Sequence, residues 1–96
     1  MDRFQFVKKH REDILKLAAL HGANHIRVFG SVARGTAGPN SDIDFLIRLD
    51  PGRSLLDHAG FLSDLEDLLK CRVDVVTEKG LRSIYREQVL REAKPL

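Results

Sequence analysis

The segment from Asp42 to Leu49 constrains the fold more than any other part of the sequence, because polar and apolar side chains alternate along it. The pleat of a strand would place its apolar side chains on one face: Ile43, Phe45, Ile47 and Leu49. An amphipathic stretch with helical spacing, residues 55–69, comes next, and a second strand-like run, Arg72 to Thr77, follows it. A strand, a long crossover helix and another strand predict parallel pairing in a right-handed unit.

The rest of the chain predicts further helices and one more strand. Residues 3–21 carry apolar side chains at helical spacing, with a weak point near His10, and His25 to Phe29 has the composition of a short buried strand. A helix that begins at Ser31 can be only about one or two turns long before a loop rich in glycine and proline. Residues 81–93 have the spacing of a final helix. The predicted order is therefore αβ(α)βαβα.

Length and composition indicate one ordinary globular domain over residues 1–96. The chain is 31% charged and 43% hydrophobic with a net charge of +2, which excludes disordered and collagen-like classes. Its longest apolar run, Leu17 to Leu20, is far shorter than the roughly 20 residues that a bilayer requires, and no signal peptide is recognisable. We expect a cytoplasmic protein without a membrane partner. The single cysteine, Cys71, permits no internal disulfide and is expected to be a small buried residue.

Charge is distributed unevenly along the chain. Residues 22–78 carry six basic and nine acidic side chains, whereas residues 1–21 and 79–96 each have a basic surplus. A nucleic-acid partner is not expected, because such binders concentrate a much larger basic surplus on one face. The acidic centre favours cation binding instead. The basic side chains of the last segment indicate a surface for a protein partner, with a solvated helix face as the alternative: Lys79, Arg82, Arg86 and Arg91.

Three aspartates are expected at one edge of the sheet, since they lie near the starts of the two parallel strands. Asp42 and Asp44 share one face of their strand about 6.6 Å apart, and two such charges repel by about 2.5 kcal/mol at an effective dielectric constant near 20. Asp74 adds a third carboxylate from the next strand. Ligand sets made only of oxygen select hard cations such as Mg²⁺ or Mn²⁺. For an Asp-x-Asp pair alone, a solvated polar face is the alternative interpretation.

A Gly-Ser pair, Gly30 and Ser31, lies at the end of the first predicted strand, shortly before the Asp-x-Asp pair. Glycine lets the backbone approach a ligand closely, and free N–H groups with a hydroxyl can hold phosphate oxygens. The chain lacks the Gly-Lys-Ser/Thr signature of a Walker loop and the three spaced glycines of a dinucleotide fingerprint. A phosphate site beside a cation site predicts binding of a nucleoside triphosphate with Mg²⁺.

These motifs together resemble those of the nucleotidyltransferases of the DNA polymerase beta superfamily. The small size of the chain resembles that of proteins in the minimal nucleotidyltransferase branch of this superfamily. The resemblance is carried by Gly30 to Gly35, Ser41 to Phe45 and Val73 to Val75. It implies an α/β (α+β) fold of the polymerase beta type, in which a small mixed three-stranded sheet packs with helices.

The resemblance also implies roles for individual residues. The catalytic and metal-binding residues would be Asp42, Asp44 and Asp74. The Asp-x-Asp pair would contact both of two Mg²⁺ ions, with Mn²⁺ as an alternative, and the third aspartate would contact only the catalytic ion. The nucleotide-binding residues would be Gly30, Ser31 and Arg34. For Arg34 a surface ion pair is the alternative role.

A function for the chain is implied as well. Many members of the minimal branch are encoded beside HEPN-domain proteins and act as their antitoxins, and some transfer AMP from ATP to a tyrosine of the toxin. The expected partners are thus ATP or another nucleoside triphosphate and a HEPN-type toxin, with self-association left open. Two alternatives are a non-catalytic antitoxin that masks its partner, and a nucleotidyltransferase subunit that modifies a small molecule or a nucleic acid.

Overall fold

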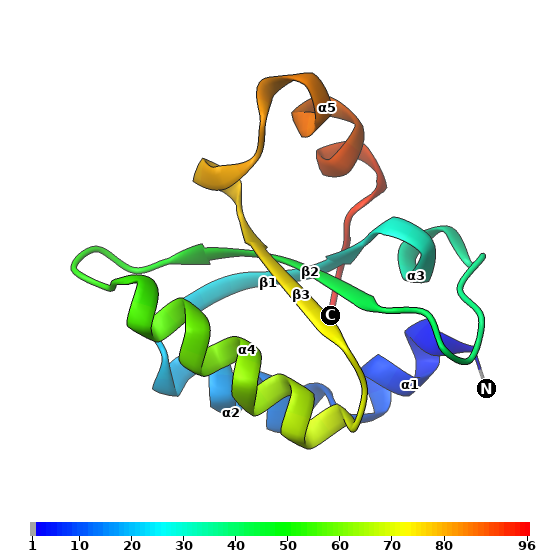
Figure 1. The fold of residues 1–96 in the computed structure, drawn as a ribbon, viewed down its shortest axis with the longest axis horizontal. Helices are drawn as coiled ribbons and strands as arrows, with labels where there is room; N and C mark the ends of the chain where they lie inside the picture. Colours follow the sequence, from blue (N-terminus) through cyan, green and yellow to red (C-terminus); the bar gives the residue numbers. More distant parts are fainter. Residues whose placement is uncertain (1) are drawn as a thin grey trace.

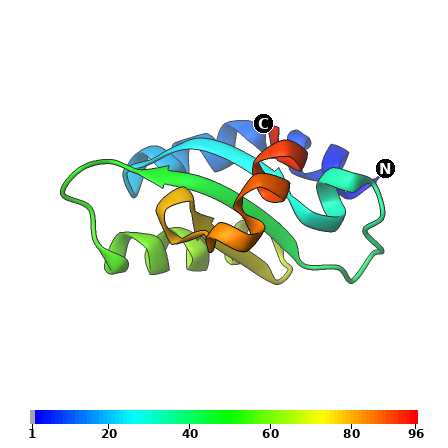
Figure 2. The ribbon, with the colours of Figure 1, turned by 90° about the horizontal axis from the view of Figure 1, so that it is seen from above.

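A computed structural model describes residues 2–96 as a mixed four-stranded sheet in the order β3-β2-β1-β4, with helices on both faces (Figures 1 and 2). The elements are α1 (Arg3–Lys9), α2 (Arg11–Leu20), β1 (Ala23–Phe29), α3 (Gly30–Arg34), β2 (Ile43–Leu49), α4 (Leu55–Leu69), β3 (Val73–Thr77), the 3₁₀ turn η1 (Glu78–Gly80), α5 (Ser83–Glu92) and β4 (Lys94–Pro95). The mixed α/β architecture predicted from the sequence is confirmed. No helix within residues 2–96 combines the length and apolar character needed to cross a membrane.

The pairing of the strands brings three chain segments to one edge of the sheet. β2 and β3 are parallel, as predicted, and Asp44 lies opposite Asp74 in their register. β1 runs antiparallel to β2, so that its last residue, Phe29, lies opposite Asp44. Helix α3 begins at the next residue, Gly30, so its start lies beside Asp44.

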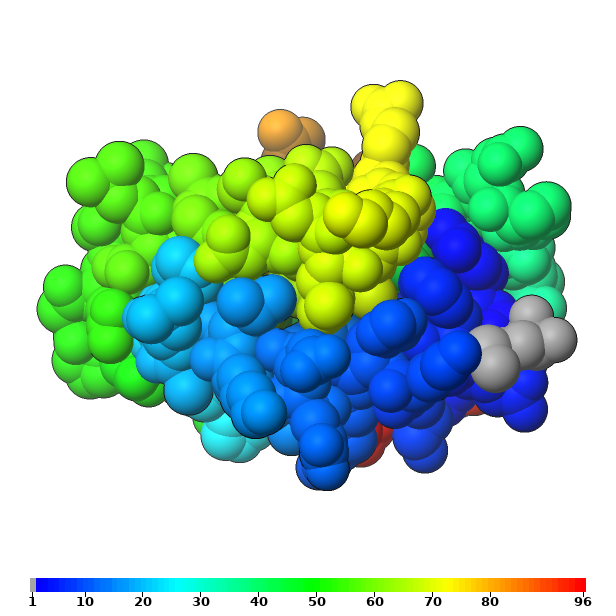
Figure 3. Space-filling model, turned by 90° about the horizontal axis from the view of Figure 1, so that it is seen from below, coloured from blue at the N-terminus to red at the C-terminus, as the bar shows by residue number. Residues whose placement is uncertain are grey.

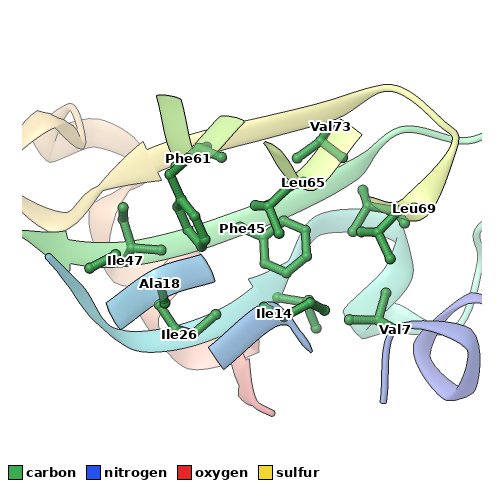
Figure 4. Close-up of a cluster of buried hydrophobic side chains, with 14 of the residues drawn as sticks. Val7, Ile14, Ala18, Ile26, Phe45, Ile47, Phe61, Leu65, Leu69 and Val73 are labelled. Carbon is green, nitrogen blue, oxygen red and sulfur yellow. The ribbon is translucent and has the colours of Figure 1, made fainter. Parts of the chain in front are cut away.

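The hydrophobic core lies between one face of the sheet and the helices α1, α2 and α4 (Figure 1). Ile43, Phe45 and Ile47 point into it from β2 and are fully buried. Phe61 and Leu65 of α4 meet them from the opposite layer (Figure 4). Figure 3 shows α1, α2 and α4 side by side over this face of the molecule. Complete burial of each such side chain stabilises the fold by about 1.5–3 kcal/mol, which holds the alternation of β2 in one register.

Several local features differ from the sequence expectations. The first helix is fully divided at His10, where the sequence predicts only a weak point, into α1 and α2. The sheet has a fourth strand, β4, whose two residues pair with β1. Two residues with a proline carry too little periodicity to indicate a strand, and Pro95 is tolerated because β4 lies at the edge of the sheet. Cys71 is half-buried against the core and not fully buried.

Candidate active site

The three predicted carboxylates lie at the start of β2 and β3. Asp44 and Asp74 are neighbours across the parallel pair, and Asp42 precedes β2 by one residue. Asp44 is half-buried, whereas Asp42 and Asp74 are exposed. The register confirms the predicted juxtaposition for Asp44 and Asp74, whereas Asp42 lies just before the paired residues of β2.

Asp44 has an unfavourable environment for its charge. Burial, followed by the charges of Asp74 and Asp42, raises the pKa of Asp44 from an ordinary value of 3.8 to about 6, although Arg34 opposes the shift. A bound cation would relieve this repulsion, because it would replace carboxylate–carboxylate contacts by attraction. The carboxylate cluster therefore has the electrostatics of a cation site.

The same carboxylates do not form a closed metal cage. Within residues 2–96, no three acidic, histidine or cysteine side chains converge closely enough to hold an ion by themselves. Mg²⁺ keeps several waters and is usually bound by one or two carboxylates together with substrate phosphates. An open set of carboxylate oxygens beside an anion site fits Mg²⁺ in this mode.

Gly30 is required at its position for two reasons. Its φ of +68° lies in the left-handed region, and a Cβ added to it would lie 2.4 Å from Oδ2 of Asp44. The backbone at the start of α3 is thus packed directly against the Asp44 carboxylate. From the sequence, we expect the missing side chain of Gly30 to let a ligand approach the backbone closely. In the structure, the Asp44 carboxylate occupies that space.

A fourth carboxylate, that of Glu92, lies at the predicted phosphate site. The Gly30 N–H donates to Glu92 Oε1 over 2.9 Å, and Nη1 of Arg34 donates to both carboxylate oxygens over 3.3 and 3.2 Å. Within residues 2–96 the Ser31 hydroxyl makes no hydrogen bond. The amide of Gly30 and the Arg34 guanidinium therefore bind an anion, and that anion belongs to the last residue of α5.

Two findings at this site complete or go beyond the sequence prediction. The sequence predicts that Arg34 binds the nucleotide or forms a surface ion pair. Arg34 forms an ion pair, and its partner, Glu92, also contacts Gly30 and so belongs to the site. Glu92 itself was missed, because 62 residues separate it from Gly30 and no local pattern connects them. A cavity of about 360 Å³ opens beside these groups, and its lining includes Gly30, Arg34, Asp74, Tyr85, Gln88 and Glu92.

The family described as Nucleotidyltransferase domain matches residues 7–96. The chain belongs to this family. It is 32% identical over 87 residues to a Methanocaldococcus jannaschii protein that carries the name protein adenylyltransferase MJ0435, covering 91% of this chain and 94% of that one. It is 42% identical over 71 residues to protein adenylyltransferase MntA of Thermococcus cleftensis, covering 74% and 72% of the two chains. This chain is thus an enzyme, a nucleotidyltransferase.

Solved structures agree with the family assignment. A minimal nucleotidyltransferase is 54% identical, superposes with a TM-score of 0.87 and covers 100% of this nucleotidyltransferase and 97% of its own chain. A toxin–antitoxin structure with AMP-PNP is 26% identical, with a TM-score of 0.74, and covers 88% and 69% of the two chains. The fold of this nucleotidyltransferase is that of the minimal branch.

A Gly30→Ala substitution should destabilise the nucleotidyltransferase more than Gly35→Ala. Both glycines have a positive φ, +68° and +76°, so each alanine meets a similar backbone penalty of about 1–2 kcal/mol. At Gly35 a Cβ would have nothing within 4 Å, whereas at Gly30 it would press on Asp44. The Asp44 carboxylate is the end of a side chain that can turn away, so we expect a further loss of about 0.5–1 kcal/mol in the free energy of unfolding, measured by urea denaturation. Equal losses for the two variants would contradict the close packing of Asp44 on Gly30.

Because the pKa of Asp44 is raised, ionisation of this carboxyl group should lower the free energy of unfolding by an amount that depends on pH. The carboxyl group binds its proton more tightly in the folded state, with a pKa of about 6 against 3.8, so this cost grows as pH rises from about 4 to 6 and is complete above that range. Without divalent cations, Asp44→Asn should raise the free energy of unfolding by about 1–2 kcal/mol at pH 8, after allowance for solvent screening, and by little at pH 4. Urea denaturation in EDTA at the two pH values measures this. Asp13→Asn on α2 is the control, and a gain from Asp44→Asn that does not change with pH would contradict the assignment.

Proposed function

We propose that this enzyme transfers AMP from ATP to a hydroxyl group of a partner protein, in the cytoplasm, as the antitoxin of a HEPN-type toxin. The observation that carries the proposal is the contact of a carboxylate cluster with an anion-binding backbone amide at Gly30. Similarity to a protein adenylyltransferase and to toxin–antitoxin structures, one of them with AMP-PNP, supports the choice of nucleotide and of acceptor.

The residues of the site divide into two groups that match the two ends of a nucleotide–metal complex. Asp42 and Asp44 would hold both of two Mg²⁺ ions, or Mn²⁺ in their place, and Asp74 would hold the one next to the acceptor. When bound, these ions stabilise the attacking and the leaving oxygens of an in-line displacement. The phosphate oxygens would accept hydrogen bonds from groups of α3: the Gly30 N–H, the Ser31 hydroxyl and the Arg34 guanidinium.

The transfer itself needs no covalent intermediate with the enzyme. The acceptor oxygen forms a bond to the α-phosphorus, the bond from that phosphorus to the bridging oxygen breaks, pyrophosphate leaves and the hydroxyl proton passes to water. The chain contributes position and charge to this step. In this proposal the acceptor hydroxyl comes from another molecule, which the site can admit because Asp42 and Asp74 are exposed.

Masking of the partner without catalysis is a second candidate, and one observation favours it. Ile84 and Tyr85 of α5 expose 79% and 56% of their surface, which is typical of side chains that a partner covers. Binding alone, however, gives no reason to place three carboxylates at one sheet edge, where they repel each other. An acceptor that is a small molecule or a nucleic acid is a further alternative, and the same experiment tests it.

Replacing Asp74 by asparagine should separate catalysis from masking. The side chain is exposed and keeps nearly the same volume, so that folding, partner binding and ATP–Mg²⁺ binding should remain close to those of the parent chain. Transfer of AMP should fall by about two orders of magnitude or more, because Asp74 would no longer help to hold an ion beside the acceptor. Calorimetry measures nucleotide binding, and mass spectrometry measures modification of the proteins encoded beside its gene.

Asp67→Asn is the matched control for this variant, since it removes the same charge from an exposed position of α4. It should leave transfer unchanged. Full neutralisation of the toxin in cells by Asp74→Asn, with the toxin unmodified, would show that masking is sufficient. Modification of a small molecule or a nucleic acid by the parent chain, with no protein modified, would overturn the choice of acceptor.

Glu92→Gln should strengthen nucleotide binding. The carboxylate competes with phosphate for the Gly30 N–H and for Arg34, and glutamine retains an oxygen acceptor while it removes the charge. We expect the affinity for ATP–Mg²⁺ to rise about three- to tenfold in calorimetry. Glu87→Gln, at an exposed position of the same helix, should have no effect. Weaker binding by Glu92→Gln would mean that Glu92 supports the phosphate site and does not compete with it.

A further inference from the structure

The cavity beside the candidate active site contains one reactive side chain that the proposed transfer does not use, the phenol of Tyr85. Tyr85 is the only tyrosine in the sequence. It also carries the only hydroxyl group among the lining residues that the structure describes. A phenol oxygen is a nucleophile of the same class as the acceptor hydroxyl in the proposed reaction.

Helix α5 places Tyr85 and Glu92 at opposite ends of this cavity. The helix follows β3 and η1 at one edge of the sheet and leads into β4 at the other edge, so that it crosses the strands (Figures 1 and 2). Tyr85, Gln88 and Glu92 are spaced by three and four residues, lie on one face of α5 and all line the cavity. Glu92 contacts Gly30, and Tyr85 lies seven residues earlier, about 10 Å along the helix axis.

Strand β3 lines the cavity together with Tyr85, through Asp74 and Val76. In the proposed mechanism Asp74 holds the ion next to the acceptor, and the phosphates lie at Gly30 and Arg34. The cavity therefore runs from the phosphate groups, past the carboxylates, to the phenol. An in-line displacement needs the leaving group, the metal ions and the attacking hydroxyl in this order.

The side chain of Tyr85 is free to turn within the cavity. It exposes 56% of its surface, and within residues 2–96 its hydroxyl makes no hydrogen bond. Exposed side chains exchange between staggered rotamers on the picosecond to nanosecond timescale. The hydroxyl can thus approach the carboxylates without the loss of a polar contact.

We propose that the enzyme transfers AMP to its own Tyr85. The inference rests on the proposed function, which supplies the ATP and the metal ions, and it adds a modification site on this chain. The Tyr85 oxygen forms a bond to the α-phosphorus of the ATP held by the same copy, and the bond from that phosphorus to the bridging oxygen breaks. Pyrophosphate leaves, the phenol proton passes to water, and a phosphodiester joins Tyr85 to AMP.

Mass spectrometry of the full chain after incubation with ATP and Mg²⁺ tests the proposal without any partner. The intact mass should rise by one adenylyl group, and fragmentation of the peptides should locate that group on Tyr85. The rate constant should not change with protein concentration, because the reaction occurs within one copy. Asp74→Asn should lower it by about two orders of magnitude or more, as in transfer to a partner.

Two variants separate the hydroxyl of Tyr85 from its ring and from its exposure. Tyr85→Phe keeps the ring, so the chain should bind ATP–Mg²⁺ in calorimetry and remain unmodified. Ile84→Tyr combined with Tyr85→Phe moves the hydroxyl by one residue, about 100° around α5. Ile84 is 79% exposed and does not line the cavity, so this double variant should also remain unmodified. Its modification at the parent rate would overturn the proposal, because exposure alone would then be sufficient.

A mixture of two variants tests whether the transfer occurs within one copy. Tyr85→Phe retains the three carboxylates, and Asp74→Asn retains the phenol. Neither variant should be modified beyond its own rate when the two are incubated together with ATP and Mg²⁺. Modification of Asp74→Asn by the other variant would overturn the intramolecular route.

The remaining outcomes distinguish failure of this inference from failure of the proposed function. An unmodified chain that transfers AMP to a protein encoded beside its gene would overturn self-modification and leave the proposed function intact. Loss of ATP binding in Tyr85→Ala but not in Tyr85→Phe, with the parent chain unmodified, would overturn it in favour of a ring that holds the nucleobase. Modification of Tyr85 with no transfer to any other protein would establish the modification site and overturn the proposed acceptor. The absence of AMP from every protein, this chain included, would overturn both.

Discussion

The parallel register that sets Asp44 beside Asp74 is the constraint on which the rest of the site depends. Burial, followed by the charge of Asp74, raises the pKa of Asp44 and so disfavours its ionisation. The fold tolerates this cost because the alternate residues of β2 are fully buried in the core. A register shift of one residue would exchange Ile43 and Phe45 with carboxylates, at a cost of several kcal/mol for each buried charge. The hydrophobic core thus determines where the repulsion occurs, and a bound cation would relieve it.

The contact of Glu92 with Gly30 joins the end of α5 to this cluster. Glu92 is also one of the charges that raise the pKa of Asp44, so it adds negative charge to the site while it occupies the amide that a phosphate would need. Displacement of Glu92 by a nucleotide would release Arg34 from α5 at the same time. A nucleotide bound at the proposed site would therefore be linked to the position of α5 through one carboxylate, and α5 also carries the exposed side chains of Ile84 and Tyr85.

The sequence predicts the parts of this site that depend on local patterns. The alternation of β2, the helical spacing of α4 and the apolar run of β3 together determine the parallel pair, and with it the common edge of Asp44 and Asp74. The sequence also indicates a weak point at His10, where α1 ends and α2 follows. The two residues of β4 are too few to show a period of their own and form a strand only by pairing with β1. The contact between Glu92 and Gly30 spans 62 residues, and it follows only from how α5 crosses the sheet.

The uneven distribution of charge along the sequence corresponds to two separate regions on the face of the sheet that α5 covers. The acidic surplus of residues 22–78 includes the aspartates at the strand starts, and the basic surplus of residues 79–96 includes Lys79 and Arg86 beside the strand ends. These acidic and basic side chains lie on one face of the sheet with α5 between them, because Leu46, midway between Asp44 and Arg48 on β2, is fully buried. A carboxylate that approaches this face is repelled at the strand starts and attracted at the strand ends.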